Sequence, residues 1–279
     1  MDYIFENNTV RVPDIKGFAL RDTLMCGQSF RWVEHSDGSF TGTAFKKTVT
    51  VKIENDDFKI IGTTQEDFED IWRGYFDLDT DYEKIREDLS KLHPVLAEAA
   101  KFAPGIRILR QEPFEALISF IISQNNNIKR IEGIVKRLCE NFGEKNEAGE
   151  YAFPTAETLA VLSPEELSPI RAGFRHRYII DAAKKVFSGE VNLESCREKS
   201  FEEAKKELMT IVGVGEKVAD CVLLYGLHKV NAFPMDVWMK RAMKKLFPDV
   251  NPESFGEYAG VAQQYIFHYS RLHSELFDE

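Results

Sequence analysis

The spacing of apolar and polar residues divides the chain into an N-terminal part with strand patterns and a C-terminal part with helix patterns. Runs rich in β-branched and aromatic residues predict strands at 30–35, 39–45, 48–53 and 58–64, with turns at 36–38 and 54–57. Acidic segments at 65–76 and 79–90 predict short helices. The first part of the chain is therefore expected to be mainly an antiparallel sheet.

From Phe102 onward the apolar residues recur with the period of an α-helix. Segments 112–124 and 128–143 carry apolar stripes, and the triplet NNN separates them. Further helices are predicted at 156–161, 164–168, 175–187, 200–210, 217–227, 236–246 and 255–273. The sequence therefore predicts an α+β fold, with an antiparallel β domain with short helices over 1–103 and a multi-helix domain over 104–279.

The composition is that of a folded chain. Hydrophobic residues make up 43% and aromatic residues 12%, which excludes a disordered class. No apolar run reaches the roughly 18 residues of a membrane span, and the N-terminus lacks the order of a signal peptide. The cysteines have neither metal-site nor disulfide-framework spacing, so we expect reduced core thiols, no metal and no required cofactor. They are Cys26, Cys139, Cys196 and Cys221. We expect a soluble, intracellular protein.

The net charge of −10 argues, taken globally, against a nucleic-acid partner. The distribution of charge weakens that argument, because basic groups cluster after residue 128 and acidic runs lie at 54–57, 66–70 and 77–88. A charged cluster is more often a solvated helix face than a binding site. Composition alone leaves the partner open.

The stretch 200–227 predicts two helices joined by a tight turn. Ser200 and Glu203 form a capping-box pattern, and the turn IVGVGEK contains Gly213 and Gly215. Both glycines allow positive φ and close approach of another backbone. Their amides, together with the N-terminus of the next helix, can bind an anion. The hairpin is therefore either a packing element or a clamp on a DNA backbone.

Two charged residues begin the helices after the hairpin. Lys217 lies at a helix N-terminus, where the helix dipole disfavours a cation. Burial and the dipole should lower its pKa, and a neutral amine is a nucleophile. Asp236 precedes an amphipathic helix and suits an N-cap, or stabilisation of positive charge on a substrate. An ion pair between the two is the alternative.

The pattern aliphatic-x-G-x-G-x-K-x-A-D, followed by PMD, resembles the helix–hairpin–helix motif of the DNA glycosylase superfamily. The resemblance implies that the backbone of Gly213, Val214 and Gly215 grips a phosphate without reading sequence. It implies Lys217 and Asp236 as catalytic residues. It also allows a monovalent cation on backbone carbonyls, which would be those of Met209, Ile211 and Val214. Because no cysteine follows Cys221, the branch with an iron–sulfur cluster is disfavoured.

Three further stretches narrow the family. They are GQSFRW at 27–32, SFIISQNNNIKRI at 119–131 and GFRHRY at 173–178. Each alone could be a strand start, a helix interruption or a helix cap. In this order, and with the hairpin, they resemble the eukaryotic-type 8-oxoguanine DNA glycosylases over nearly the whole chain. That resemblance implies base flipping, in which the lesion enters a pocket.

The same resemblance assigns roles to individual residues. The carbonyl of Gly27 would accept a hydrogen bond from the N7–H that only the oxidised guanine carries. The other lesion-pocket residues would be Cys221, Tyr225, Gln263 and Phe267. The residues at the DNA gap and the orphaned cytosine would be Asn125, Arg130, Phe174 and Arg175.

Three positions depart from the family pattern. Phe174 stands where tyrosine is common, Trp238 where a phosphate-contacting histidine is usual, and Tyr225 where methionine is frequent. Stacking survives at Phe174, but a phenolic hydrogen bond does not. We therefore expect a relaxed preference for cytosine opposite the lesion.

The sequence thus predicts a bifunctional glycosylase/lyase of base excision repair that removes 8-oxoguanine from duplex DNA through a lysine Schiff base and β-elimination. It predicts a monomer without membrane association, located in the cytoplasm or nucleoid, or in the nucleus of a eukaryote. Two alternatives stay open: a glycosylase for alkylated or fragmented purines, and a non-catalytic DNA-binding module.

Overall fold

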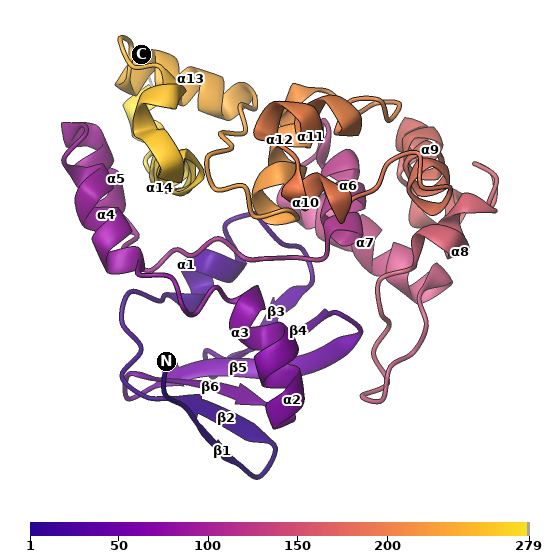
Figure 1. Ribbon diagram of the computed structural model, residues 1–279, viewed down its shortest axis with the longest axis horizontal. Coiled ribbons are helices and arrows are strands. Elements are labelled where there is room, and N and C mark those ends of the chain that lie inside the picture. Colours follow the sequence, from indigo (N-terminus) through magenta and orange to yellow (C-terminus); the bar gives the residue numbers. More distant parts are fainter. Residues whose placement is uncertain (278–279) are drawn as a thin grey trace.

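A six-stranded antiparallel sheet forms the first part of the molecule (Figure 1). The computed structural model describes residues 1–277. The four predicted strands are confirmed, and two strands that the patterns did not single out precede them at the N-terminus. The sheet order is β1-β2-β6-β5-β4-β3. The strands are β1 (Ile4–Glu6), β2 (Thr9–Val12), β3 (Trp32–Glu34), β4 (Phe40–Ala44), β5 (Lys47–Glu54) and β6 (Asp57–Ile61).

The predicted helix at 65–76 packs on this sheet. It is built from α2 (Gln65–Asp67), a π-helical turn (Phe68–Trp72) and α3 (Arg73–Tyr75). Trp72 stacks on Phe76, whose ring lies edge-on to Phe58 of β6 at 5.1 Å between centroids. These rings are fully buried and join the sheet and its helical cover into one apolar core.

The rest of the chain is helical, as predicted. The longer helices are α4 (Tyr82–Ser90), α5 (Pro94–Phe102), α6 (Pro113–Ser123), α7 (Ile128–Phe142), α9 (His176–Phe187), α11 (Phe201–Leu208), α12 (Glu216–Tyr225), α13 (Val237–Leu246) and α14 (Ala259–Leu272). Shorter ones are α1 (Leu20–Leu24), α8 (Ala156–Ala160) and α10 (Ser195–Glu198). Segments of 3-10 helix lie at Ser168–Ile170, Gly173–Arg175, Pro252–Tyr258 and Ser274–Phe277.

Two predicted helices differ from the structure. The prediction at 164–168 is wrong: this stretch is a run of turns followed by a 3-10 helix, because Pro169 lacks an N–H and restricts the residue before it. The single helix predicted at 255–273 is instead a 3-10 segment followed by α14. Gly256, with φ +69° and ψ −145°, breaks the helix there.

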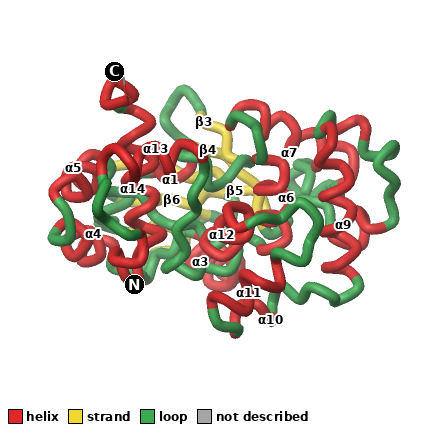
Figure 2. The backbone as a smooth tube through the Cα atoms, turned by 90° about the horizontal axis from the view of Figure 1, so that it is seen from above, coloured by secondary structure: helices red, strands yellow, loops and turns green. Residues whose placement is uncertain are grey.

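The helical part has one large apolar core, and α6 and α12 lie side by side within it (Figures 1 and 2). Helices α4 and α5 contribute Ile85, Leu89 and Leu96 to this core although they precede residue 104. The packing of the helical core therefore extends across the predicted domain boundary at 103/104. That boundary stays a prediction. Within residues 1–277, none of the helices combines the length and hydropathy that a membrane span requires.

Candidate active site

The predicted hairpin joins α11 to α12, and the capping box before α11 is present. The backbone N–H of Ser200 donates to Glu203 Oε2, and that of Glu203 donates to Ser200 Oγ. Gly213 has φ +83°, and a Cβ there would lie 2.4 Å from the ring of Tyr178. Only glycine satisfies both the backbone conformation and the packing at this position.

The hairpin presents backbone donors. Across the described residues, the N–H groups of Gly213 and Gly215 have no hydrogen-bond partner. By contrast, the N–H of Val212 donates to Asp181 Oδ2 at 2.7 Å, which ties the turn to α9. Val212 itself is half exposed. The turn is thus fixed from behind while two amides at the start of α12 remain able to bind an anion.

Lys217 lies in the first turn of α12 and points toward α6. Its Nζ donates to Ser123 Oγ at 3.1 Å and lies 5.3 Å from the ring centroid of Phe120. Phe120 and Ser123 are three residues apart on α6 and therefore share one face. The packing of α6 on α12 thus holds the amine in one place.

Asp236 is the N-cap of α13. Its Oδ1 accepts a hydrogen bond from the N–H of Met239 at 2.7 Å. Burial raises the pKa of the Cys221 thiol to about 11; the charge of Lys217 opposes this rise, whereas Asp220 and Asp236 add to it. Capping therefore fixes Asp236, and its charge acts on the same buried thiol as that of Lys217.

The predicted lesion-pocket residues meet where α12 faces α14. Cys221, Tyr225 and Gln263 are all buried, and the Tyr225 ring stacks on Phe120 with centroids 5.2 Å apart. Phe267 is partly buried one turn after Gln263. Tyr225 and Lys217 thus both lie against Phe120, and Lys217 also acts on Cys221. That Gln263 and Phe267 enclose the same base stays a prediction.

Gly27 lies in a loop held by its neighbour Gln28. Gln28 is fully buried, and its amide bonds the carbonyl of Arg107 at 2.8 Å and the N–H of Leu109 at 2.9 Å. Gln111 continues this link, because its N–H donates to the carbonyl of Tyr225. Gly27 has φ +94°, and a Cβ there would lie 3.1 Å from Ile128 Cδ1. These bonds connect the Gly27 loop to the end of α12.

The residues predicted at the DNA gap lie in the NNN loop, on α7 and in the 3-10 turn Gly173–Arg175. Asn125 is exposed with φ +48°, and Phe174 is 56% exposed. Arg130 is exposed on α7. The guanidinium of Arg175, by contrast, is buried. It donates hydrogen bonds to the carbonyls of Gln124, Asn125 and Ala172. In this structure Arg175 supports the NNN loop, so its contact with an orphaned cytosine stays a prediction.

Known proteins resemble this chain over most of its length. Residues 10–117 match the family model 8-oxoguanine DNA glycosylase, N-terminal domain, and residues 118–253 match HhH-GPD superfamily base excision DNA repair protein. The N-glycosylase/DNA lyase of Saccharomyces cerevisiae is 34% identical over 274 residues, covering 88% of this chain and 72% of the yeast protein. This chain belongs to the 8-oxoguanine DNA glycosylase family, whose members combine glycosylase and lyase activity.

Two solved structures are similar over nearly the full chain. The structure of MBOgg1 in complex with a low-affinity DNA ligand has a TM-score of 0.94 and 45% identity, covering 98% of this chain and 100% of that one. The Clostridium acetobutylicum 8-oxoguanine glycosylase/lyase, in complex with duplex DNA containing cytosine opposite 8-oxoguanine, has a TM-score of 0.91 and 39% identity, with the same coverage.

Trp238, which departs from the family pattern, has its own partners here. Its Nε1 donates to Ser270 Oγ at 2.8 Å, and that hydroxyl donates to the carbonyl of Phe267 at 3.2 Å. Its ring also lies against Phe277. The indole therefore braces the turn of α14 that carries Phe267.

The sequence patterns did not identify several residues of the candidate active site. Ser123 and Phe120 lie in the stretch SFIISQ, where their spacing on one helix face was the available signal. Gln28 lies in GQSFRW, and nothing local predicts its contacts across the fold. Among residues 1–277, no group of three or more His, Cys, Asp or Glu side chains could hold a metal.

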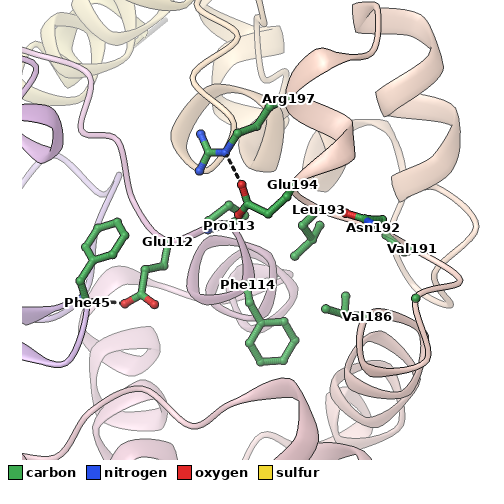
Figure 3. A pocket seen from close by; sticks show the side chains of 11 residues that line it. Phe45, Glu112, Pro113, Phe114, Val186, Val191, Asn192, Leu193, Glu194 and Arg197 are labelled. Carbon is green, nitrogen blue, oxygen red and sulfur yellow. Dashed lines mark hydrogen bonds and ion pairs between the residues drawn. The ribbon is translucent and has the colours of Figure 1, made fainter. Parts of the chain in front are cut away.

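A separate cavity of about 410 Å³ lies at the other end of α6 (Figure 3). Pro113 and Phe114 line it, Glu112 accepts a hydrogen bond from the N–H of Phe45, and Glu194 pairs with Arg197 above it. Ser123 ends α6 roughly 15 Å away along the helix axis. This cavity is therefore not the region around Lys217.

Proposed function

We propose that this protein flips 8-oxoguanine out of duplex DNA and excises it, with Lys217 as nucleophile at C1′ and subsequent β-elimination, in base excision repair. The observation that carries the proposal is the position of the Lys217 amine. It lies in the first turn of the helix that follows the hairpin, fixed by Ser123 and Phe120 and close to the buried Cys221. A phosphate bound by the hairpin would bring the DNA backbone to this amine.

The chemistry follows from these groups. The lone pair of the neutral Nζ forms a bond to C1′ while the C1′–N9 bond breaks. The base leaves with that electron pair and takes up a proton. One proton of the resulting ammonium then passes to O4′ as the C1′–O4′ bond breaks, and the freed nitrogen lone pair forms the protonated Schiff base between Nζ and C1′. Removal of a C2′ proton then expels the 3′ phosphate, and water hydrolyses the imine to restore Lys217. Asp236 stabilises the positive charge that develops on the sugar.

The remaining roles complete the proposal. Gly27, Cys221, Tyr225, Gln263 and Phe267 would enclose the lesion. The residues facing the gap would be Asn125, Arg130, Phe174 and Arg175. The protein would act as a monomer in the compartment that holds the genomic DNA, which is the nucleoid or, in a eukaryote, the nucleus.

Borohydride trapping tests the nucleophile. Wild-type protein is mixed with duplex DNA containing 8-oxoguanine opposite cytosine and reduced, which converts the imine to a stable amine. We expect a covalent complex with wild type and with the control Lys84→Gln, which changes an exposed lysine of α4. We expect none with Lys217→Gln. A complex that persists in Lys217→Gln would disprove the assigned nucleophile.

A panel of lesions tests the substrate. Excision of 8-oxoguanine with little excision of 3-methyladenine is expected. The reverse result would make the protein an alkylbase glycosylase. Binding without excision of either base and without trapping would make it a DNA-binding module.

The proposal includes a monovalent cation on the hairpin carbonyls of Met209, Ile211 and Val214. Carbonyl oxygens are hard, neutral ligands suited to such an ion. The Ile211 carbonyl accepts one hydrogen bond, from the N–H of Val214 at 3.0 Å, and keeps a second lone pair for a cation. Replacing potassium by choline at constant ionic strength should then weaken DNA binding.

A further inference from the structure

A series of hydrogen bonds links three buried side chains, one on α12 and two on α14. Gln263 Nε2 donates to the carbonyl of Pro234, and Gln264 Nε2 donates to Gln263 Oε1, both at 3.3 Å. Gln264 Nε2 also donates to the hydroxyl of Tyr225 on α12. Gln263 and Gln264 are at most 4% exposed, so these bonds have no competition from bulk water.

The partners determine how both amides are oriented. The Pro234 carbonyl can only accept, so the NH₂ group of Gln263 must face it. The Gln263 Oε1 atom then faces the NH₂ group of Gln264. The second hydrogen of that group points to the Tyr225 hydroxyl. Each amide in the chain therefore has one defined orientation.

Tyr225 forms one end of this series of hydrogen bonds and is held rigidly. Its ring stacks on Phe120 at an interplanar angle of 19°, and its carbonyl accepts a hydrogen bond from Gln111. Burial raises the pKa of the phenol well above its usual value, so the hydroxyl is neutral. A fixed, neutral hydroxyl can hold the Gln264 amide in place.

The oriented Gln263 amide retains one N–H and one lone pair. A guanine edge presents an acceptor, O6, beside a donor, N1–H. An adenine edge presents a donor, the N6 amino group, beside an acceptor, N1. An amide fixed in one orientation matches one of these patterns and opposes the other, whereas an amide able to rotate by 180° matches both.

We propose that Tyr225 and Gln264 are positioning residues that fix the amide of Gln263 and thereby make the enzyme prefer an oxidised guanine over an oxidised adenine. The inference rests on the proposed function, because it assumes that Gln263 contacts the flipped base.

The test compares single-turnover rates on three duplexes, which contain 8-oxoguanine, 8-oxoadenine or a preformed abasic site opposite cytosine. The variants are Tyr225→Phe, Gln264→Leu and the double variant. The control is Tyr265→Phe, which removes an equally buried hydroxyl that has no hydrogen-bond partner among the described residues.

Tyr225→Phe loses one buried hydrogen bond, and Gln264→Leu loses two, to the Tyr225 hydroxyl and to Gln263 Oε1. The ratio of 8-oxoguanine excision to abasic-site nicking should fall roughly 5- to 30-fold in Tyr225→Phe and at least as much in Gln264→Leu. The ratio of 8-oxoguanine to 8-oxoadenine excision should fall as well. The double variant should be no worse than Gln264→Leu, because the hydroxyl acts through Gln264. Tyr265→Phe should keep the wild-type ratios.

Equal losses on all three duplexes would overturn the inference and leave a purely structural role. Unchanged ratios in Gln264→Leu would overturn it too, and this variant decides the question if Tyr225→Phe does not fold. A wild-type protein that nicks abasic DNA but does not excise 8-oxoguanine would instead overturn the proposed function.

Discussion

The Nζ atom of Lys217 donates a hydrogen bond to Ser123 Oγ, across the interface between α12 and α6. This bond restrains a long, flexible side chain at the position from which it would attack. Ser123→Ala should slow base excision about 5- to 10-fold, since a hydrogen bond of this kind contributes about 1 kcal/mol. Borohydride trapping should still succeed because Lys217 is intact.

The matched control is Ser119→Ala, one turn earlier on α6. The Ser119 hydroxyl is buried but makes no hydrogen bond to another described residue. An equal loss of rate in the two variants would mean that Ser123 acts through packing rather than through Lys217.

Gly27→Ala should impair excision much more than nicking of a preformed abasic site. The substitution strains a backbone with φ +94° and pushes a methyl group toward Ile128, which moves the carbonyl proposed to read the lesion. Gly38→Ala is the control, since it has φ +79° but no atom within 4 Å of the added Cβ. Rates on the two substrates measure the effect. If Gly38→Ala lost excision activity to the same extent, the effect of Gly27→Ala would come from general backbone strain and not from the displaced carbonyl.

The two hairpin glycines should differ in their tolerance of alanine. At Gly213 an added Cβ would collide with the Tyr178 ring at a positive φ, so the hairpin must shift. At Gly215 nothing lies within 4 Å of the added Cβ. We expect Gly213→Ala to weaken DNA binding at least tenfold and Gly215→Ala much less. Fluorescence anisotropy at two salt concentrations measures this. Wild-type affinity should fall steeply with salt, because a DNA footprint neutralises phosphates.

Phe174→Ala should lower activity without lowering stability. The ring is 56% exposed and lies edge-on to Tyr178, so its removal leaves no cavity in the core. Loss of stacking on a base should cost about 1–3 kcal/mol, or roughly 5- to 150-fold in excision. The control is Phe187→Ala on α9, where the ring is 55% exposed. A melting temperature that falls with activity in Phe174→Ala would contradict this assignment.

Asp77 should make the fold sensitive to acid. It is buried and accepts hydrogen bonds from Tyr82 and Arg110, and His228 lies 3.4 Å away. Burial alone would raise the pKa of Asp77, but His228 and Arg110 lower it well below its usual value. Because the folded-state pKa lies below the unfolded value of about 3.9, this stabilisation is present above about pH 4 and is lost at lower pH.

Asp77→Asn should therefore destabilise the protein by about 1.5–3 kcal/mol near neutral pH and flatten the loss of stability in acid. Urea unfolding across pH 3 to about 7 would measure both effects. The exposed Asp249, changed to Asn, is the control. If the free energy of unfolding of Asp77→Asn fell with acid as steeply as that of the wild type, other carboxyl groups would be responsible for the acid sensitivity.

Much of the fold was predictable because the relevant signals are local. Alternating apolar residues with turn residues between them predicted β3 to β6, and the period of 3.6 predicted most helices. The hairpin around Gly213 was predictable for the same reason. The failures at 164–168 and at Gly256 arose where Pro169 and a positive φ overrode the apolar spacing.

The sequence by itself determined which chemical groups the chain possesses and where its elements begin: Lys217 at the start of a helix and Asp236 as a cap follow from short-range patterns. Only the tertiary structure decided what these groups touch. The bond of Lys217 to Ser123 joins residues 94 positions apart, and that of Gln28 to Arg107 spans 79. The burial of Arg175 and the amide chain from Gln263 to Tyr225 also depend on how the helices pack, because such contacts leave no periodic trace along the chain.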